Sequence, residues 1–232
     1  MKYRGIVFDK DGTLLDFNRT WLPIYRYAAQ EFAEGDTVLA ESLLTQHGFD
    51  RSTNKFTGGS LLAAGNNQQI ADAWAVQLDK PDQVEIISRQ LHRIFRDQGA
   101  IQATPVKQLA NTLKQLKQSG RKLGVATADS HQGIINTLQA FGVLQEFDFL
   151  AGYDSGHGVK PEPGMVLAFC AQMAIPAESV VVVGDNRHDI EMGRNANAGL
   201  CVGVLTGTST RSDLEGIADI VIEDISLLAE VI

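Results

Sequence analysis

Short apolar runs alternate with amphipathic stretches along two separate parts of the chain. Gly5-Ile6-Val7-Phe8 is the first such run, and its length and bounding polar residues predict a buried strand. Further strands are predicted at 123–126, 147–150, 180–183, 200–205 and 219–222, with helices at 106–118, 131–141, 163–174 and 188–196 and a short one at the end. Strands that alternate with helices predict an α/β fold, a Rossmann-like parallel sheet covered on both faces.

The stretch between the first two strands has a helical pattern instead. Apolar residues recur there at helical spacing, and we expect Thr20 to cap this helix with Pro23 in its first turn. The residues of this stripe are Trp21, Ile24, Tyr25, Ala28 and Phe32, and further helices are predicted at 36–47, 68–79 and 82–97, with a polar connection at 50–67. No strand is predicted here. The sequence therefore predicts an all-helical cap domain, 17–100, inserted into a core of residues 1–16 and 101–232.

Composition narrows the class of protein. The 232 residues suit one α/β domain with a smaller insertion, and 44% of them are apolar. A formal charge of −8 without a dense Lys/Arg run argues against nucleic acid or an anionic membrane as a partner. Cys170 and Cys201 lie in apolar contexts and are expected to be small buried hydrophobes. No signal peptide or membrane span is predicted, so we expect a cytoplasmic protein. We expect it to be a monomer or a homodimer.

The chemistry-bearing residues begin where the first strand ends. Asp9 and Asp11 stand one residue apart in Asp9-Lys10-Asp11-Gly12-Thr13, and their repulsion needs a cation or a proton to offset it. Gly12 allows a sharp turn and a close approach of the backbone to a ligand. Two acids, a turn and a hydroxyl point to phosphoryl chemistry around a divalent metal. The alternative is a plain Asp-rich turn.

Polar residues also follow other predicted strands. Thr127 follows the second strand and Asp185 follows the strand at 180–183, while Lys160 lies in a loop with two prolines. Because ligands of open parallel sheets bind beyond the carboxyl ends of the strands, we expect these side chains to lie together. They offer a nucleophile, an acid, a hydroxyl donor, a cation and a metal ligand.

With these residues in order, the chain resembles phosphatases of the haloacid dehalogenase superfamily that carry a helical cap, in particular the phosphoglycolate-phosphatase-like members. The resemblance covers the whole core, whereas the cap is similar only in position and helical character. It rests on four motifs: Asp9–Thr13, Thr127, Lys160-Pro161-Glu162-Pro163 and Gly184-Asp185-Asn186-Arg187-His188-Asp189.

The resemblance implies a role for each matching residue. Asp9 would attack phosphorus and form an aspartyl-phosphate, and Asp11 would protonate the leaving oxygen and then activate water. Thr127, the backbone N–H of Ala128, and Lys160 would bind the phosphoryl group. Mg²⁺ would be the cofactor, held by the Asp9 carboxylate, the Asp11 backbone carbonyl and Asp185.

Other positions keep alternatives open. We expect Asp189 to orient Lys160 or the loop rather than to bind the metal, and Thr13 either orients Asp11 or completes the turn. Ala128 stands where many relatives have Asn, so one hydrogen bond to substrate is expected to be missing. Lys10 stands where capped relatives often have an apolar residue, and it is either structural or in contact with the leaving group.

The predicted function is Mg²⁺-dependent hydrolysis of a small phosphorylated metabolite, a monoester such as phosphoglycolate. Asp11 favours phosphate esters, because cleavage of such an ester requires a proton donor for the leaving oxygen. A sugar phosphomutase of the same fold and a non-catalytic phosphate or metal sensor remain as alternatives. Within the polar segment 51–60, Arg51 or Lys55 would meet a substrate carboxylate; the other interpretation is a solvated loop.

Overall fold

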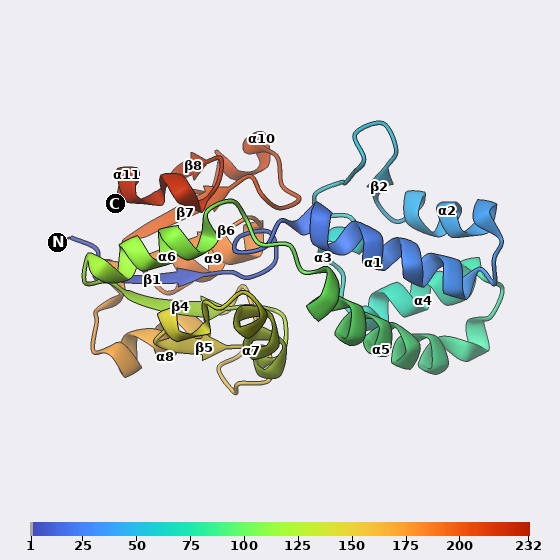
Figure 1. Ribbon diagram of the computed structural model, residues 1–232, viewed down its shortest axis with the longest axis horizontal. Helices are drawn as coiled ribbons and strands as arrows, with labels where there is room; N and C mark the ends of the chain where they lie inside the picture. The colour runs from blue at the N-terminus through green and yellow to red at the C-terminus, as the bar shows by residue number, and fades with distance from the viewer. Residues whose placement is uncertain (1) are drawn as a thin grey trace. The chain divides into compact units, whose positions relative to one another are not determined.

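The computed structural model describes residues 2–232, which form two compact units (Figure 1). Unit 1 comprises the chain up to Phe17 together with Thr104–Ile232, and unit 2 is Asn18–Ala103. Within unit 1 the outgoing and returning segments are joined, because the Asp16 N–H donates to the Thr104 carbonyl at 3.0 Å and the Val106 N–H donates to the Leu14 carbonyl at 3.0 Å. Unit 2 is therefore inserted a few residues after the Asp9–Thr13 turn.

Unit 1 is built on a six-stranded sheet in which every pairing is parallel. The order is β5-β4-β1-β6-β7-β8. The strands are β1 (Gly5–Phe8), β4 (Lys122–Ala126), β5 (Phe149–Ala151), β6 (Val180–Gly184), β7 (Leu200–Val204) and β8 (Ile220–Ile222). This arrangement confirms the predicted parallel α/β class. β1 lies between β4 and β6, where the strand order reverses, which is the position at which such sheets bind ligands.

Alternate residues of the strands face opposite layers of helices. Ile6 and Phe8 pack with α6 (Leu109–Gln118), α7 (His131–Ala140) and α11 (Leu228–Val231), whereas Val7 packs with α8 (Gly164–Met173) and α9 (Arg187–Asn195). Both faces of β1 are therefore buried, as a parallel sheet requires. The remaining helical segments of unit 1 are η2 (Leu144–Glu146), η3 (Ala177–Ser179), α10 (Arg211–Leu214) and η4 (Ile225–Leu227), of which η2, η3 and α10 are not predicted from the sequence.

Unit 2 is helical apart from one short hairpin. Its helices are α1 (Phe17–Phe32), which begins on the last residue of unit 1, α2 (Thr37–Thr45), α3 (Leu61–Ala64), α4 (Asn67–Gln77), η1 (Pro81–Gln83) and α5 (Val84–Gln102). Trp74 is fully buried, and its ring meets that of Phe32 with centroids 5.7 Å apart. The apolar stripe of α1 therefore belongs to the core of unit 2. Within residues 2–232, no helix has both the length and the apolar character that crossing a membrane requires.

Three details of unit 2 correct the sequence-based expectations. β2 (Phe49–Asp50) and β3 (Lys55–Phe56) form an antiparallel pair that the sequence does not predict, because strands of two residues are too short to show alternation. Thr20 is not an N-cap, since α1 begins at Phe17 and places Thr20 and Pro23 inside the helix. α5 ends at Gln102, beyond the predicted end of this helix at 97.

Candidate active site

Three of the predicted site residues follow adjacent strands of unit 1. Asp9 follows β1, Thr127 follows β4 and Asp185 follows β6, and β1 pairs with both of the other strands. The Asp9 N–H continues the ladder by donating to the Val183 carbonyl at 2.8 Å. All three residues are buried. The sheet therefore brings them to one edge, as the sequence predicts.

Lys160 joins two of the carboxylates. Its Nζ lies 2.5 Å from Asp9 Oδ1 and 2.6 Å from Asp189 Oδ1, and only 7% of its side chain is exposed. The loop that carries it is held in turn, because Asn195 Nδ2 at the end of α9 donates to the Pro161 carbonyl at 2.9 Å. Burial disfavours the ammonium, but Asp189 and Asp9 outweigh it and raise the pKa of Lys160 above its ordinary value.

Negative charge exceeds positive charge in this cluster. Carboxylate oxygens of Asp9, Asp185 and Asp189 all lie within 4.8 Å of one another, and Lys160 is the ammonium that contacts two of these residues. Burial, reinforced by repulsion from Asp189 and Asp11, raises the pKa of Asp9 to about 7 despite Lys160. Burial, reinforced by repulsion from Asp189 and Asp9, also raises the pKa of Asp185. Three ionised carboxylates against one ammonium leave a formal charge of −2, and an all-oxygen donor set of this charge fits Mg²⁺.

A second loop of unit 1 encloses Asp185, and sequence reasoning missed it. The Thr208 N–H donates to Asp185 Oδ2 at 3.1 Å, and Thr206 Oγ1 donates to the Gly12 carbonyl at 2.6 Å. Gly207 leaves the space that the carboxylate fills, because a Cβ there would overlap Asp185 Oδ2. Gly12 leaves similar space and has a φ of +94°. The position of this loop could have identified it from the sequence. Thr206-Gly207-Thr208 comes shortly after β7, just as Asp9, Thr127 and Asp185 come after β1, β4 and β6.

Asp189 is held at both carboxylate oxygens. Oδ1 accepts from Lys160, and Oδ2 accepts from the Asn186 N–H at 3.0 Å in a capping box that starts α9. These contacts are those of a residue that orients Lys160, while its distance from Asp9 and Asp185 also suits a metal ligand. Its role stays a prediction.

Two of the residues predicted to hold the phosphoryl group, Thr127 and Ala128, directly follow β4. Thr127 Oγ1 accepts from the Asp129 N–H at 3.2 Å, and Ala128 is exposed. Thr13 is fully buried, and its Oγ1 has no hydrogen-bond partner within residues 2–232. Its backbone N–H donates to the Lys10 carbonyl at 3.4 Å, so the contact that the structure gives Thr13 is the one that completes the turn.

Asp11 and Lys10 form an ion pair at the same turn. Lys10 Nζ lies 2.8 Å from Asp11 Oδ2 and 3.0 Å from Asp129 Oδ2, and its side chain is 4% exposed. Burial disfavours the Lys10 ammonium, but the two carboxylates outweigh this and raise its pKa above the ordinary value. Asp129, which the sequence analysis did not select, thus belongs to the same cluster of charges.

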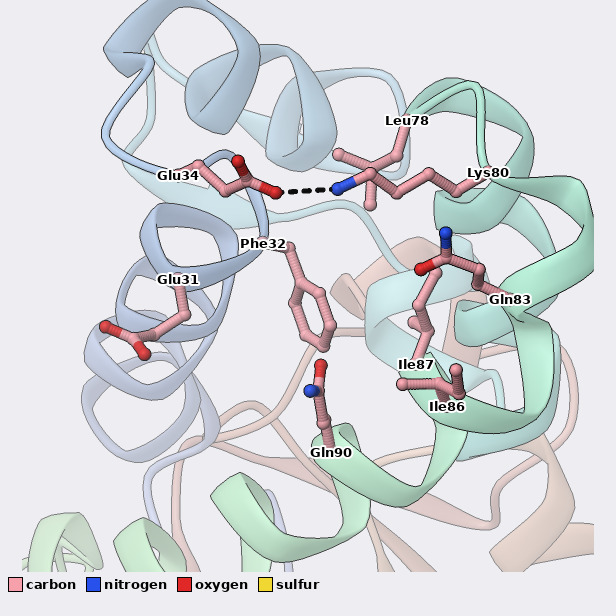
Figure 2. A pocket seen from close by; sticks show the side chains of 9 residues that line it. All are labelled: Glu31, Phe32, Glu34, Leu78, Lys80, Gln83, Ile86, Ile87 and Gln90. Atoms are coloured by element: carbon pink, nitrogen blue, oxygen red, sulfur yellow. Dashed lines mark hydrogen bonds and ion pairs between the residues drawn. The ribbon is translucent and has the colours of Figure 1, made fainter.

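The predicted cap residues lie in unit 2. Arg51 Nε pairs with Glu41 Oε1 at 2.5 Å and is largely exposed, and Lys55 is an exposed residue of β3. A separate pocket of unit 2 contains neither of them (Figure 2). Residues from α1, η1, α5 and the loops beside them line it, and the ion pair between Glu34 and Lys80 at 2.7 Å lies at its rim. The contribution of Arg51 and Lys55 to substrate binding stays a prediction.

Comparison with known proteins finds phosphatases that are similar to this chain. The chain is 24% identical over 196 residues, 84% of its length and 79% of the relative's, to the N-acetylmuramic acid 6-phosphate phosphatase of Pseudomonas aeruginosa. It is 26% identical over 210 residues to the phosphoglycolate phosphatase of Shigella sonnei, covering 83% and 78% of the two chains.

Solved structures show the same fold at low sequence identity. One from Haemophilus somnus 129PT, described as a predicted phosphoglycolate phosphatase, has a TM-score of 0.77 at 20% identity and covers 100% of this chain and 98% of its own. Another from Thermotoga maritima, described provisionally as a β-phosphoglucomutase, has a TM-score of 0.73 at 19% identity and covers 99% and 100%. A family model of haloacid dehalogenase-like hydrolases matches residues 3–197, and the chain belongs to this family.

Proposed function

We propose that this protein hydrolyses small phosphate monoesters through an aspartyl-phosphate on Asp9, with Mg²⁺ as cofactor. The observation that carries the proposal is the buried bridge from Asp9 through Lys160 to Asp189, with Asp185 beside it. A carboxylate held by an ammonium at the end of a central strand is a fixed nucleophile in a site suited to negative charge. Relatives that are phosphatases by name support the same reaction class.

In the first step a carboxylate oxygen of Asp9 attacks phosphorus, and the bond from phosphorus to the ester oxygen breaks. The electron pair stays with the ester oxygen, which takes a proton from the Asp11 carboxyl group and leaves as an alcohol. Thr127 Oγ1 accepts a hydrogen bond from the Asp129 N–H, and we assign its hydroxyl hydrogen to a phosphoryl oxygen. The Ala128 N–H and Lys160 bind the other oxygens.

In the second step water attacks the aspartyl-phosphate. Asp11, now a carboxylate, takes a proton from this water as the new bond to phosphorus forms. The bond between phosphorus and the Asp9 oxygen breaks, and its electron pair restores the Asp9 carboxylate. Inorganic phosphate leaves, and Asp11 again carries the proton that the next cycle requires.

The carboxylates of Asp9 and Asp185 and the backbone carbonyl of Asp11 would hold Mg²⁺. The ion supplies positive charge that offsets the carboxylates and the phosphoryl oxygens. Lys160 provides one positive charge in a cluster that has a formal charge of −2 when its carboxylates are ionised. Asp189 then acts by fixing Lys160.

The substrate class is a small phosphorylated metabolite. The names of two relatives point to N-acetylmuramic acid 6-phosphate and phosphoglycolate as their substrates, and each of these molecules carries a carboxylate as well as a phosphate ester. Arg51 and Lys55 of unit 2 are the cations that we assign to such a carboxylate. The cytoplasmic location expected from the sequence remains part of this proposal.

A sugar phosphomutase is the second candidate. It uses the same two aspartates, and a solved structure of the same fold is provisionally described as a β-phosphoglucomutase. The reactions differ in product, because a mutase returns an isomeric sugar phosphate and a phosphatase releases inorganic phosphate. Incubation with a sugar phosphate and analysis of both products separates the two. A non-catalytic sensor would give neither product.

Hydrolysis of an aryl phosphate tests the proposed function. The protein is assayed with Mg²⁺ and then with excess chelator, and Asp9→Asn is assayed beside it. We expect activity to need Mg²⁺ and to fall at least about 1,000-fold in Asp9→Asn, because the amide is a poor nucleophile. Asp97→Asn, which alters the exposed pair with Arg96 in unit 2, is the control and should keep full activity. Comparable activity in Asp9→Asn would remove Asp9 as the nucleophile.

A further inference from the structure

Lys10 is a buried cation that the proposed reaction does not use. Its ammonium contacts two carboxylates, Asp11 Oδ2 at 2.8 Å and Asp129 Oδ2 at 3.0 Å. A lysine that is only 4% exposed loses most of its hydration, so these two contacts must compensate for it. Lys10 therefore cannot move far: Asp129 offsets its charge when Asp11 carries the proton that the proposed reaction requires, and the ammonium then donates a hydrogen bond to the Asp11 carboxyl group.

Asp129 is the anchor of this arrangement, because α7 holds it in place. The Ser130 N–H donates to Asp129 Oδ1 at 2.6 Å, and Ser130 in turn caps α7 through the Gly133 N–H. Gly133 leaves room for the carboxylate, since a Cβ there would overlap both Asp129 oxygens. Contacts thus run from the first turn of α7 through Asp129 and Lys10 to Asp11.

The backbone of Lys10 is fixed as well. Its carbonyl accepts from the N–H groups of Leu14 at 2.9 Å and Leu15 at 3.0 Å, which closes the turn that carries Asp11. Both the backbone and the side chain of Lys10 are therefore restrained. A restrained lysine between two carboxylates serves to orient them, and only one of the two is a proposed proton donor.

We propose that Lys10 and Asp129 are a positioning pair that holds the Asp11 carboxyl group in line with the leaving oxygen of the substrate. The inference rests on the proposed function, in which Asp11 donates the proton to that oxygen. A general acid must lie within hydrogen-bond reach of its target, and a displacement of about 1 Å costs on the order of 100-fold in rate. Neither Lys10 nor Asp129 needs to touch the substrate for this role.

The identity of the leaving group distinguishes positioning from general support of the fold. An alkoxide leaves only with a proton, whereas a nitrophenolate leaves readily without one. Loss of Asp11 alignment should therefore slow the first step for an alkyl phosphate far more than for p-nitrophenyl phosphate. A site that is distorted as a whole should lose activity toward both esters alike.

The experiment measures release of alcohol or phenol in the first turnover, with glycerol phosphate and p-nitrophenyl phosphate, for the full chain. Lys10→Met and Asp129→Asn are the test variants, and the second leaves the lysine in place should the first fail to fold. We expect a fall of about 100-fold with the alkyl ester and less than about threefold with the aryl ester. Lys117→Met is the matched control, because it removes another ion pair of unit 1, with Asp148 at 2.7 Å, and should leave the ratio of the two rates unchanged.

A double-mutant cycle completes the test. In an Asp11→Asn background, Lys10→Met should cause no further loss with the alkyl ester, because the group that it positions can no longer donate the proton. Equal losses on both esters, an unchanged ratio, or losses that add to those of Asp11→Asn would overturn the inference. If the wild-type protein hydrolyses neither ester, the proposed function fails and the inference fails with it; if it hydrolyses both, such results remove the inference alone.

Discussion

At the scale of single residues, the site is a set of buried and half-buried charges, each held by a neighbour. Lys160 lies between Asp9 and Asp189, and Lys10 lies between Asp11 and Asp129. Asp185 differs, because its carboxylate accepts from a backbone N–H, that of Thr208, rather than from a lysine. Charged groups this well buried require compensation, so the carboxylate that lacks a lysine is the strongest candidate to meet a metal ion.

The space around Asp185 gives a test that substitutes none of the proposed metal ligands. Gly207→Ala should raise the dissociation constant for Mg²⁺ at least about tenfold, because the added Cβ would overlap Asp185 Oδ2 and displace it. Gly207 does not have a positive φ, so alanine introduces no backbone strain. Titration calorimetry measures the affinity.

Gly216→Ala is the control for this change, because a Cβ at Gly216 would meet nothing within 4 Å. It should leave metal affinity and the melting temperature unchanged. Equal affinities for Gly207→Ala and the wild-type protein would mean that Asp185 does not bind the metal in the position described.

The strand pattern predicts those site residues that directly follow strands. Asp9, Thr127 and Asp185 do so, and the strand pattern alone places them together. Asp129 and Lys10 are different, because their pairing depends on the distance between two turns that are more than a hundred residues apart. That distance is a property of the folded sheet, and the local sequence of neither turn predicts it.

At the scale of elements, the parallel sheet needs its shorter strands fixed in register. Asp148 does this next to β5: it accepts from Lys117 Nζ at 2.7 Å, from the Leu123 N–H at 3.0 Å and from Lys122 Nζ at 3.2 Å. One side chain thus joins α6, β4 and the start of β5. Burial opposes the ionised form, but these hydrogen bonds outweigh it and lower the pKa of Asp148 below its ordinary value.

This lowered pKa predicts a pH-dependent contribution to stability. The charged form of Asp148 is favoured in the folded state, so its contribution is present above the unfolded pKa and is lost as the pH falls through the folded value. Asp148→Asn should lower the free energy of unfolding by about 1 kcal/mol at neutral pH and by less in acid. Urea unfolding at several pH values measures this; Asp97→Asn, in an exposed pair, is the control. A difference that grows in acid would contradict the assignment.

The pattern of apolar positions predicts most elements but not their ends. The β5 prediction at 147–150 begins two residues early, because Asp148 turns its side chain toward Leu123 and leaves Phe149 as the first strand residue. The β2–β3 pair is missed because Phe49 and Phe56 are buried by pairing with each other, a contact that no local period encodes.

At the scale of the whole molecule, the chain divides into unit 1, which carries the candidate active site, and the inserted helical unit 2. Every residue that we assign to the chemistry lies in unit 1, whereas Arg51 and Lys55 lie in the hairpin region of unit 2. This division predicts that changes in unit 2 alter substrate preference without altering the reaction. Caps that close over a site commonly select the substrate and exclude water.

Exchange of Arg51 and Lys55 for alanine tests that division of labour. The double variant should raise KM for phosphoglycolate about tenfold, and much less for a neutral ester, because a charge-assisted contact to the carboxylate is lost. The value of kcat should change little. Arg96→Ala, which removes another exposed cation of unit 2, is the control. Equal effects on both substrates would show that this hairpin is not the selector.

The central claim is that Asp9 carries the phosphoryl group between the two steps. The most direct measurement is an acid quench of the first turnover, followed by mass spectrometry of the peptide that contains Asp9. We predict a phosphorylated peptide in the wild-type protein and none in Asp9→Asn. Turnover without any phosphorylated form of this peptide, or phosphorylation that persists in Asp9→Asn, would contradict the mechanism.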